Sequence, residues 1–468
     1  MMLTPLAFAV LFAPPPPPPV VGWPSHGGDA QHTARSTVAS QHLNAIQWSF
    51  PIDLNPRYSG NDLLSHYGSP VVSSDNVLIV GQKQDIDSGF KVKSMSATDG
   101  TLLWSEDSDY IMPPHGWTPS FGPCLSGLTV SKSARYAVWP AAGGRIGFRS
   151  ASGKEPARTV AFYGNAEYAA HAAEYNDAIR ICTPITPGRD GNVYFGFIAL
   201  ADTPSHLKSG VAKVNFNSGT WVAADVLSGD PNMNQVKMNS APAVTVDGNT
   251  LYVTLTSGGW GYGDLVKVRT SDLQELARTP LLDPVSGSSA IVEDAGTACP
   301  MIGPDGDVYM GVLENPFPAN HDRGWLLHYS GDLSQTKIPG AFGWDDTPSV
   351  VPASSVPSYT GSSQYLLVSK YNNYAGVGGD GVNRIALLDP NVAATESISG
   401  AQTMAEVATI TGPTPDLDYI GGHPNAVREW CVNSAVVDVP GHAVLLNCEA
   451  ACFIAGVSTP SNSRRASG

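Results

Sequence analysis

The stretch SAPAVTVDGNTLYVTL, residues 240–255, sets the fold of this 468-residue chain, because its pattern returns along the sequence. A proline lies in an extended run, Asp247-Gly248 forms a turn, and a strand centred on Tyr252 follows. Asp-Gly pairs accept the positive φ angles that tight hairpins require. The pattern therefore predicts two antiparallel strands joined by a short turn.

Six further stretches follow this pattern: GSPVVSSDNVLIV (68–80), FGPCLSGLTVSKSARYAVW (121–139), CTPITPGRDGNVYFGF (182–197), ACPMIGPDGDVYMGV (298–312), DTPSVVPASSVPSYTGSSQYLLVS (346–369) and NSAVVDVPGHAVLLN (433–447). The centres of the second strands are Leu78, Tyr136, Tyr194, Tyr252, Tyr309, Tyr365 and Val444. Successive centres are 58, 58, 58, 57, 56 and 79 residues apart, and five intervals this similar do not arise by chance. The last interval is longer because extra residues precede Trp430.

Each period holds two more strand-like runs after the hairpin, as in FKVKSMSATDGTLLWSED (90–107) and DLVKVRTSDLQELAR (264–278). Repeated units of four strands indicate a β-propeller, in which each blade buries its faces against its neighbours. A string of independent sandwiches is the alternative, but a sandwich domain needs about 100 residues. We therefore predict an all-β fold, a propeller of about seven, or eight, four-stranded antiparallel blades.

The end of the chain departs from the repeat. After Asn447, where a third strand and a Trp-bearing fourth strand are expected, the sequence reads CEAACFIAGVSTPSNSRRASG. We expect the last blade to be incomplete. Either the segment 46–50, which contains Trp48, closes the ring, or an eighth blade is absent, or the end is divergent or out of frame. The predicted domains are the propeller at 22–448 and a divergent, disordered tail at 449–468.

The N-terminal segment 1–21 combines an apolar run, Leu3 to Ala13, with the proline tract Pro14 to Pro19. The run is too short to span a bilayer and resembles the core of a signal peptide, although no basic residue precedes it. The proline tract predicts a stiff, extended spacer. We expect export, to the periplasm or outside the cell, and no transmembrane segment.

Composition excludes one class of partner. Charged residues are 14% of the chain and the net charge is −15, with Arg464-Arg465 the only arginine pair. Nucleic-acid binding needs clustered Lys and Arg, so we expect no nucleic-acid partner. The acidic balance indicates solubility alone, or else a cationic or neutral ligand.

The six cysteines are scattered, without a CxxC pair or metal-like spacing. We expect mostly buried free thiols. Cys448 and Cys452 are close enough in sequence for a disulfide to be tested.

Two motifs resemble a known family. ATDGTLLW (97–104) is similar to the tryptophan-docking motif of quinoprotein alcohol dehydrogenases, with Ala97, Asp99, Gly100 and Trp104 in place, but with shorter spacing and no Lys. WPSHGGDAQHTARS (23–36), followed by Leu43 and Trp48, resembles the first strand of the same family. Over residues 22–448 the chain resembles the PQQ-binding-like (quinoprotein alcohol dehydrogenase-like) β-propeller repeat proteins.

This resemblance implies the propeller fold and makes PQQ and Ca²⁺ the possible cofactors, although many members bind no quinone. Many dehydrogenases of the family carry two adjacent cysteines beside the quinone, and no two cysteines are adjacent here. Their calcium-binding and catalytic carboxylates have no matching positions in this chain. The resemblance therefore assigns no catalytic residue.

In a four-stranded meander the connections alternate between the two ends of the sheet. The turns between first and second strands are short here, whereas the loops between second and third strands and between blades are long and rich in aromatic residues. Binding residues usually lie on long loops of a rigid scaffold. We call the end with the long loops the loop-rich face and expect any site there.

The segments between blades should converge on the central channel. They bring the candidate ligand-binding residues His66, Tyr67, His115, Trp117, Asn239, Asp294, Asp345, Asp346, Arg428, Glu429 and Trp430. Asp345 and Asp346, beside Trp344, either hold Ca²⁺ under a stacked planar ligand or cap structure, and Asp346 is the candidate metal ligand. Neighbouring residues on a strand point to opposite sides, so one of the two should face the channel.

Two further sets of candidates have alternative interpretations. His66 and His115 are acid–base groups or structural histidines. Arg428 binds a carboxylate or pairs with Glu429 between blades.

The sequence lacks the GxSxG, HExxH and Walker patterns of common hydrolases, zinc peptidases and nucleotide-hydrolysing enzymes. The favoured hypothesis is an exported, monomeric, non-catalytic scaffold that binds a small molecule or a protein on the loop-rich face. The alternatives are a PQQ- and Ca²⁺-dependent alcohol or sugar dehydrogenase, and a lyase or hydrolase that uses funnel His and acidic residues.

Overall fold

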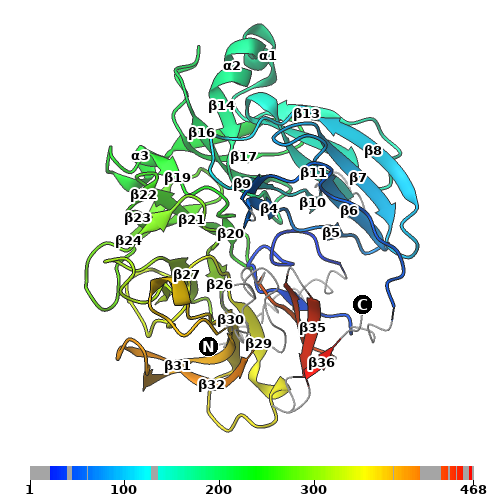
Figure 1. Cartoon of the computed structure of the whole chain (residues 1–468). Helices are drawn as coiled ribbons and strands as arrows, with labels where there is room; N and C mark the ends of the chain where they lie inside the picture. The colour runs from blue at the N-terminus through cyan, green and yellow to red at the C-terminus, as the bar shows by residue number, and fades with distance from the viewer. Residues whose placement is uncertain are drawn as a thin grey trace, which may run out of the picture.

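The protein is described by a computed structural model over residues 22–39, 45–60, 62–127, 135–382, 384–411, 434–440, 443–448, 451–456 and 463–465. Within these ranges seven sheets follow one another along the chain. They stand around a common centre, with the colour passing from blue through green to red around the ring (Figure 1). The predicted all-β propeller is confirmed.

The first four sheets follow the predicted strand order. The first is β5 (Val71–Val72), β6 (Val77–Gln82), β7 (Phe90–Ser96) and β8 (Leu102–Ser108), and the second is β10 (Cys124–Gly127), β11 (Arg135–Ala141), β12 (Arg145–Ser150) and β13 (Arg158–Ala161). The third is β14 (Ile179–Ile181), β15 (Thr186–Pro187), β16 (Val193–Ala199), β17 (Gly210–Val214) and β18 (Gly219–Ala223). The fourth is β19 (Gln235–Val236), β20 (Ala243–Val244), β21 (Thr250–Thr256), β23 (Gly263–Arg269) and β24 (Glu275–Pro280).

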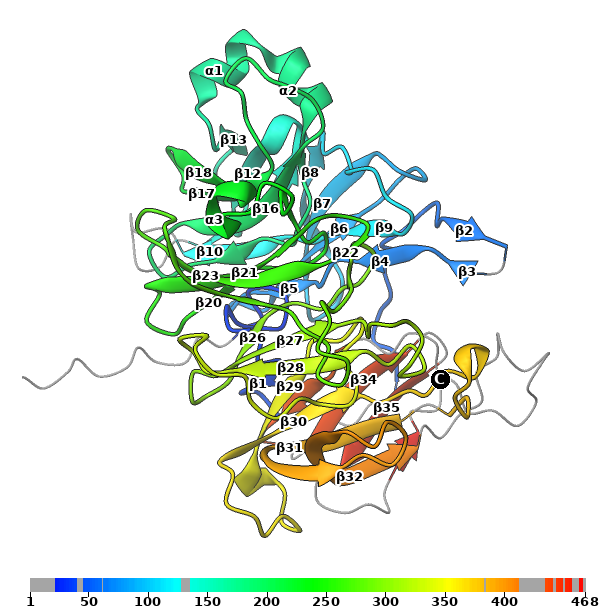
Figure 2. The same cartoon turned by 90° about the vertical axis from the view of Figure 1, so that its left-hand side faces the viewer.

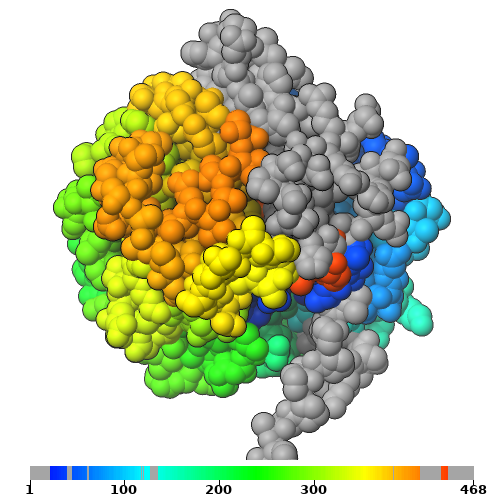
Figure 3. Space-filling model, turned by 90° about the horizontal axis from the view of Figure 1, so that it is seen from below, coloured from blue at the N-terminus to red at the C-terminus, as the bar shows by residue number. Residues whose placement is uncertain are grey.

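Three sheets complete the ring. The fifth is β26 (Met301–Ile302), β27 (Val308–Val312) and β28 (Trp325–Tyr329), and the sixth is β29 (Ser349–Pro352), β30 (Tyr365–Lys370), β31 (Arg384–Thr395) and β32 (Gln402–Thr411). The seventh is β1 (Arg35–Ser36), β33 (Val436–Asp438), β34 (Ala443–Cys448), β35 (Ala451–Gly456) and β36 (Ser463–Arg465). From below, the sixth sheet, in orange, forms much of the visible side of the ring (Figure 3).

The loops between the strands of the seven sheets contain short strands and helices. The strand pairs are β2 (Tyr58–Ser59) with β3 (Asp62–Leu63), β4 (Ser65–Tyr67) with β9 (Thr118–Phe121), and β22 (Trp260–Gly261) with β25 (Val292–Glu293). The helices are α1 (Asn165–Ala170), α2 (Ala172–Ala178) and α3 (Ala224–Ser228), with 3₁₀ turns η1 (Ala142–Gly144), η2 (Ala353–Ser355) and η3 (Ala375–Val377). In Figure 2 the β2–β3 hairpin and the α1–α2 pair project from the ring. In the described part of the chain no helix is long and apolar enough to cross a bilayer.

The repeat read from the sequence is confirmed at the second strands, whereas among the described residues the fifth sheet has three strands and the third and fourth sheets have five. All seven predicted strand centres lie in second strands, namely β6, β11, β16, β21, β27, β30 and β34. Asn76, Gly191, Gly248 and Gly306 have φ angles of 60°, 78°, 75° and 89° at the first turns. This is the left-handed region that Asp-Gly and related turns adopt readily.

The aromatic strand centres also join neighbouring sheets. The Tyr309 and Tyr365 hydroxyls are 2.6 Å apart, and Tyr365 donates to Asp305 at 2.9 Å. Trp104, at 7% exposure, donates its indole N–H to the Ala151 carbonyl of the next sheet at 3.0 Å. Trp104 therefore packs between neighbouring sheets, and the hydrophobic core lies between sheets, where each blade covers the next.

The segment 22–36 fills the centre of the ring. Its backbone bonds in turn to the innermost strands of six sheets, at Val72, Leu125, Val244, Ile302, Val350 and Val437, with N···O distances of 2.7–2.9 Å. His26 of the same segment lines a small cavity with Pro184 and Ile185 of the third blade. We call residues 22–36 the central segment, and it contacts every blade.

The end of the chain differs from the prediction. Residues 451–456 and 463–465, placed in a disordered tail by the sequence, form β35 and β36 and bring the last antiparallel sheet to four strands. Residues 46–50 form no strand, because Trp48 instead packs on Gly100 and donates to the Ala97 carbonyl at 3.2 Å. The strand that joins the last sheet from the N-terminal side is β1, parallel to β33.

Candidate functional site

The segments between blades bring charged side chains close to one another. Lys237 follows β19, Glu293 ends β25, Asp345 precedes β29, and Lys370 ends β30. Lys237 interacts electrostatically with Glu293 and Asp345, and His66 interacts electrostatically with Lys237, Asp345 and Lys370. The predicted convergence of inter-blade segments is therefore present for His66 and Asp345.

His66 lies flat on the ring of Trp117. The ring centroids are 5.4 Å apart and the planes differ by 11°. The parallel pairing of β4 with β9 holds the two side chains together. The Nδ1 atom of His66 is buried without a hydrogen-bond partner in the described residues, and burial lowers the His66 pKa, with Lys237 and Lys370 acting in the same direction. His66 is therefore a neutral imidazole near pH 7.

The adjacent residues Asp345 and Asp346 accept hydrogen bonds from different segments. Thr297 donates its backbone N–H to Asp345 Oδ1 at 2.7 Å. Burial alone would raise the Asp345 pKa, but Lys370, His66 and the hydrogen bonds from Thr297 outweigh burial and lower it. Asp346 Oδ2 accepts from the Ser369 hydroxyl at 2.8 Å and from the Lys370 amide at 3.1 Å. Burial raises the Asp346 pKa. Both carboxylates join neighbouring segments.

Below the mouth lies a buried thiol. Cys299 is fully buried, and the Ala241 amide donates to its Sγ at 3.1 Å. Burial alone would raise the pKa of the Cys299 thiol, but His26, this amide and Lys237 outweigh burial and lower it. The thiol in turn raises the His26 pKa against the effect of burial. Cys299 Sγ also lies 3.3 Å from the Thr297 carbonyl and 3.5 Å from the Asn239 carbonyl, both of which can accept its S–H.

Asn239 and Asp294 stand beside this pair. Asn239 is buried at a φ of 61°, and its Nδ2 donates to the Asp294 carbonyl at 3.4 Å. Asp294 Oδ2 accepts the Gly259 amide at 2.9 Å, and burial raises its pKa. Both side chains thus connect the fourth and fifth blades.

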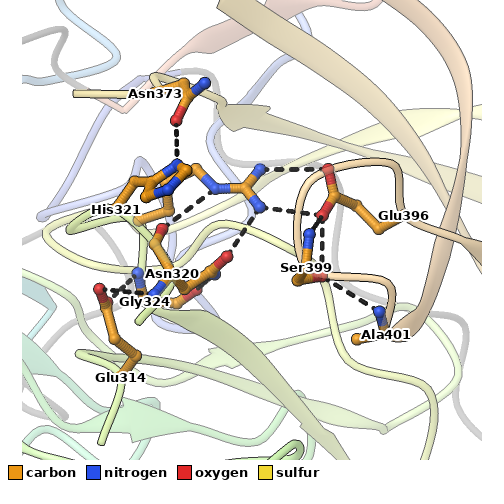
Figure 4. A network of polar contacts seen from close by, with 9 residues as sticks. Glu314, Asn320, His321, Gly324, Asn373, Glu396, Ser399 and Ala401 are labelled. Carbon is orange, nitrogen blue, oxygen red and sulfur yellow. Dashed lines mark hydrogen bonds and ion pairs between the residues drawn. The ribbon is translucent and has the colours of Figure 1, made fainter. Parts of the chain in front are cut away.

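A loop of the fifth blade is held by a network of polar contacts, which Figure 4 shows. Glu314 accepts from the Asp322 amide at 2.7 Å and the Gly324 amide at 2.8 Å. Burial and then Glu314 raise the pKa of Asp322 to about 7. Arg323, fully buried, donates to Glu396 Oε2 at 2.9 Å and ties this loop to the sixth sheet.

The remaining candidates lie elsewhere. Tyr67 points outward, is 43% exposed, and donates to Asp53 at 3.2 Å. His115 faces a separate pocket away from the channel. Arg428 and Trp430, with Glu429, lie outside the described residues. Cys124, Cys182 and Cys299 are buried free thiols, as predicted.

The separate pocket opens on the loop-rich face beside the first three blades. Its volume is about 490 Å³, and its lining residues are Arg57, Asp87, Ile111, Met112, Pro113, Pro114, His115, Arg180 and Leu200. Arg57 donates to His115 Nε2 at 3.0 Å and pairs with Asp87 at 3.4 Å. We call it the arginine pocket.

The described residues do not fit the calcium and quinone site that the resemblance implies. Ca²⁺ takes six to eight oxygen ligands. Among these residues no three His, Cys, Asp or Glu side chains come together in a way that could hold a metal ion. The Asp346 carboxylate is already used by Ser369, Lys370 and Ser434, and Trp344 packs on Gly296.

Sequence reasoning missed Lys237, Cys299, Arg57 and Arg180. Lys237 and Cys299 lie in inter-blade segments that the repeat located, so their place near the channel could have been inferred. Arg57 and Arg180 come from segments 123 residues apart, and no local pattern joins them.

No protein-family model matches this chain, and no curated protein matches it. A europium-containing methanol dehydrogenase matches with a TM-score of 0.52 and 10% identity over 95% of this chain and 85% of that chain. Quinohemoprotein alcohol dehydrogenases from Comamonas testosteroni and Pseudomonas putida HK5 each match with a TM-score of 0.50, at 12% and 11% identity, over 95% of this chain and 73% and 72% of theirs. The chain therefore shares the β-propeller fold of these solved dehydrogenase structures.

Proposed function

We propose that the protein is a non-catalytic binding scaffold that takes a ligand on its loop-rich face. The observation that carries this proposal is the arginine pocket, whose volume of about 490 Å³ lies within the usual range of small-molecule sites. It lies on long loops that a rigid ring supports, where binding sites are common.

The contents of the channel support a site away from the axis. The central segment occupies the middle of the ring, and the polar side chains at the mouth mostly bond to one another. A ligand on the axis would have to replace these contacts. The arginine pocket needs no such rearrangement.

The experiment is a thermal-shift screen of the purified protein against anionic, cationic and neutral aromatic compounds. Leu200→Trp places a large ring in the pocket, and we expect it to abolish the stabilisation by any bound compound. Leu276→Trp is the matched control, because Leu276 is 42% exposed and Leu200 is 45% exposed, and Leu276 does not line the pocket. If no compound stabilises the protein, or if Leu200→Trp leaves stabilisation intact, this function is wrong.

The second candidate is a PQQ- and Ca²⁺-dependent alcohol or sugar dehydrogenase, which the fold favours. Titration with PQQ and Ca²⁺, followed by absorbance and dye-coupled activity, tests it. Quinone binding at micromolar concentration that Asp346→Asn weakens would favour the dehydrogenase. The absence of binding would favour the scaffold.

We also propose export, which rests on the apolar run and the proline tract of residues 1–21. The mass of the protein recovered from outside the cytoplasm tests this proposal. We expect a loss of about the first twenty residues. A full-length mass, or retention in the cytoplasm, would contradict it.

A further inference from the structure

We infer that the arginine pocket takes a small organic anion with an apolar body. This inference rests on the proposed function and names the ligand class of the same pocket. It is carried by two guanidinium groups and one carboxylate that line the pocket together with apolar side chains.

The charges in the pocket do not cancel. Arg57 and Arg180 supply two positive charges, and Asp87, which pairs with Arg57, supplies one negative charge. Arg180 forms no ion pair with the described residues. Its Nη1 donates to the carbonyls of Asn176 at 2.5 Å and Ile179 at 3.1 Å. Two arginines and one carboxylate therefore line the pocket, and Asp177, which does not line it, also acts electrostatically on Arg180.

His115 contacts Arg57 at the edge of the pocket. A guanidinium donates hydrogen bonds and cannot accept them, so the Arg57 contact at 3.0 Å makes His115 Nε2 an acceptor. The proton is then on Nδ1, which donates to the Pro113 carbonyl at 2.5 Å. Asp87 Oδ1 lies 3.6 Å from the same Nε2, so His115, Arg57 and Asp87 form one cluster on this side of the pocket.

The hydrogen-bonding capacity of Arg180 is only partly used. The guanidinium has five N–H donors, and only Nη1 donates to described residues, while Nε is buried without a partner. Planar guanidinium groups bind carboxylates, sulfonates and phosphates through charge-assisted hydrogen bonds. An anionic head group would accept hydrogen bonds from the remaining N–H groups of Arg180.

The rest of the wall is apolar and partly open. Ile111 is 40% exposed and Leu200 is 45% exposed, and Met112, Pro113 and Pro114 also line the pocket. An aromatic or aliphatic body would cover this surface and gain about 25 cal/mol per Å² of apolar area buried. Charge and apolar wall together define a ligand with one anionic end.

The test compares two probes of the same shape, 2-naphthoate and its neutral amide, 2-naphthamide, by titration calorimetry on the full chain. We expect naphthoate to bind at least about tenfold more tightly than the amide, because hydrogen bonds to charged groups are stronger than neutral ones. Arg180→Gln should remove this preference, and Arg180→Lys should keep part of it. Arg158→Gln is the matched control, because Arg158 lies over the Phe216 ring outside the pocket and carries the same charge.

The outcomes separate this inference from the proposed function. If the amide, or a cationic analogue, binds as well as naphthoate and Leu200→Trp blocks it, the pocket is a binding site but the anionic class is wrong. Equal loss of naphthoate affinity in Arg158→Gln and Arg180→Gln would also overturn the inference, because the effect would then come from net charge alone. If neither probe binds and the screen finds no ligand, both proposals fail. Tighter binding of a peptide carboxylate than of naphthoate would reject the small-molecule class.

Discussion

His32 is a fully buried histidine whose charge state the fold controls. Its Nδ1 lies 2.7 Å from the Pro300 carbonyl, so it carries the proton, and its Nε2 is buried without a partner in the described residues. Burial, and then the charge of His26, lowers the His32 pKa from 6.5 to about 3. A lowered pKa means that the unfolded chain binds a proton more readily, so stability is present above pH 6.5 and is lost as the pH falls toward 3.

We expect this residue to reduce the free energy of unfolding by about 2 kcal/mol between pH 7 and pH 5. His32→Asn keeps a donor for Pro300, tolerates the φ of 63°, and cannot titrate. Urea unfolding at several pH values should therefore show a flatter pH dependence in this variant. An unchanged slope would show that His32 is not the responsible group.

At Gly324 the lack of space for a side chain should limit substitution more than the backbone dihedral angles do. Its φ is +58°, and an added Cβ would lie 1.9 Å from the Val312 carbonyl oxygen. Gly287 has a φ of +71° with nothing within 4 Å, so it shares only the conformational cost. Gly287→Ala should cost about 1 kcal/mol and Gly324→Ala about 3 kcal/mol or more, measured by urea unfolding. Equal costs would refute the steric argument.

Among the elements, the central segment 22–36 connects the blades through backbone hydrogen bonds. It bonds to the innermost strands of six sheets and connects the first sheet, at Val72, to the last, at Val437. A chain that begins at residue 39 should lose cooperative unfolding and resistance to proteases, because these inner strands lose their partners. A chain that begins at residue 22 is the matched control and should unfold like the full chain. Protease resistance in the shorter chain would contradict this role.

The loop 314–324 is tied to the sixth sheet by a buried ion pair. Arg323 is 0% exposed and the Glu396 side chain 3% exposed, and Arg323 also donates to Asn320 Oδ1 at 2.7 Å. Removing one partner leaves a buried charge unpaired, so Arg323→Met should lower the free energy of unfolding by about 3–5 kcal/mol. Arg323→Met combined with Glu396→Gln should recover part of this loss in urea unfolding. A double variant as unstable as the sum of the single variants would exclude direct coupling.

For the whole molecule we predict a monomer in solution. Each blade covers the faces of its neighbours, and the net charge of −15 opposes association of identical copies. Light scattering should give the mass of one chain at 0.15 M salt, unchanged on dilution. A dimer mass that persists on dilution would contradict this prediction.

The sequence alone determined the repeat. Strand centres 56–58 residues apart and Asp-Gly turns are local features, so the second strands and their turns could be located without knowledge of contacts. The ends of the ring could not, because the partners of residues 35–36 and of 451–456 depend on how the circle closes. Trp48 looked like part of a closing strand, but its indole packs on the turn at Gly100.

Only the tertiary structure decided which side chains meet. His66 and His115 stand in similar inter-blade segments, yet His66 turns to Trp117 at the channel mouth and His115 to Arg57 in the arginine pocket. Local periodicity specifies which residues form strands, since turn chemistry and hydrophobic alternation act over a few residues. Closing the ring brings together residues far apart in sequence, such as Arg57 and Arg180, and so forms the pocket and its charge.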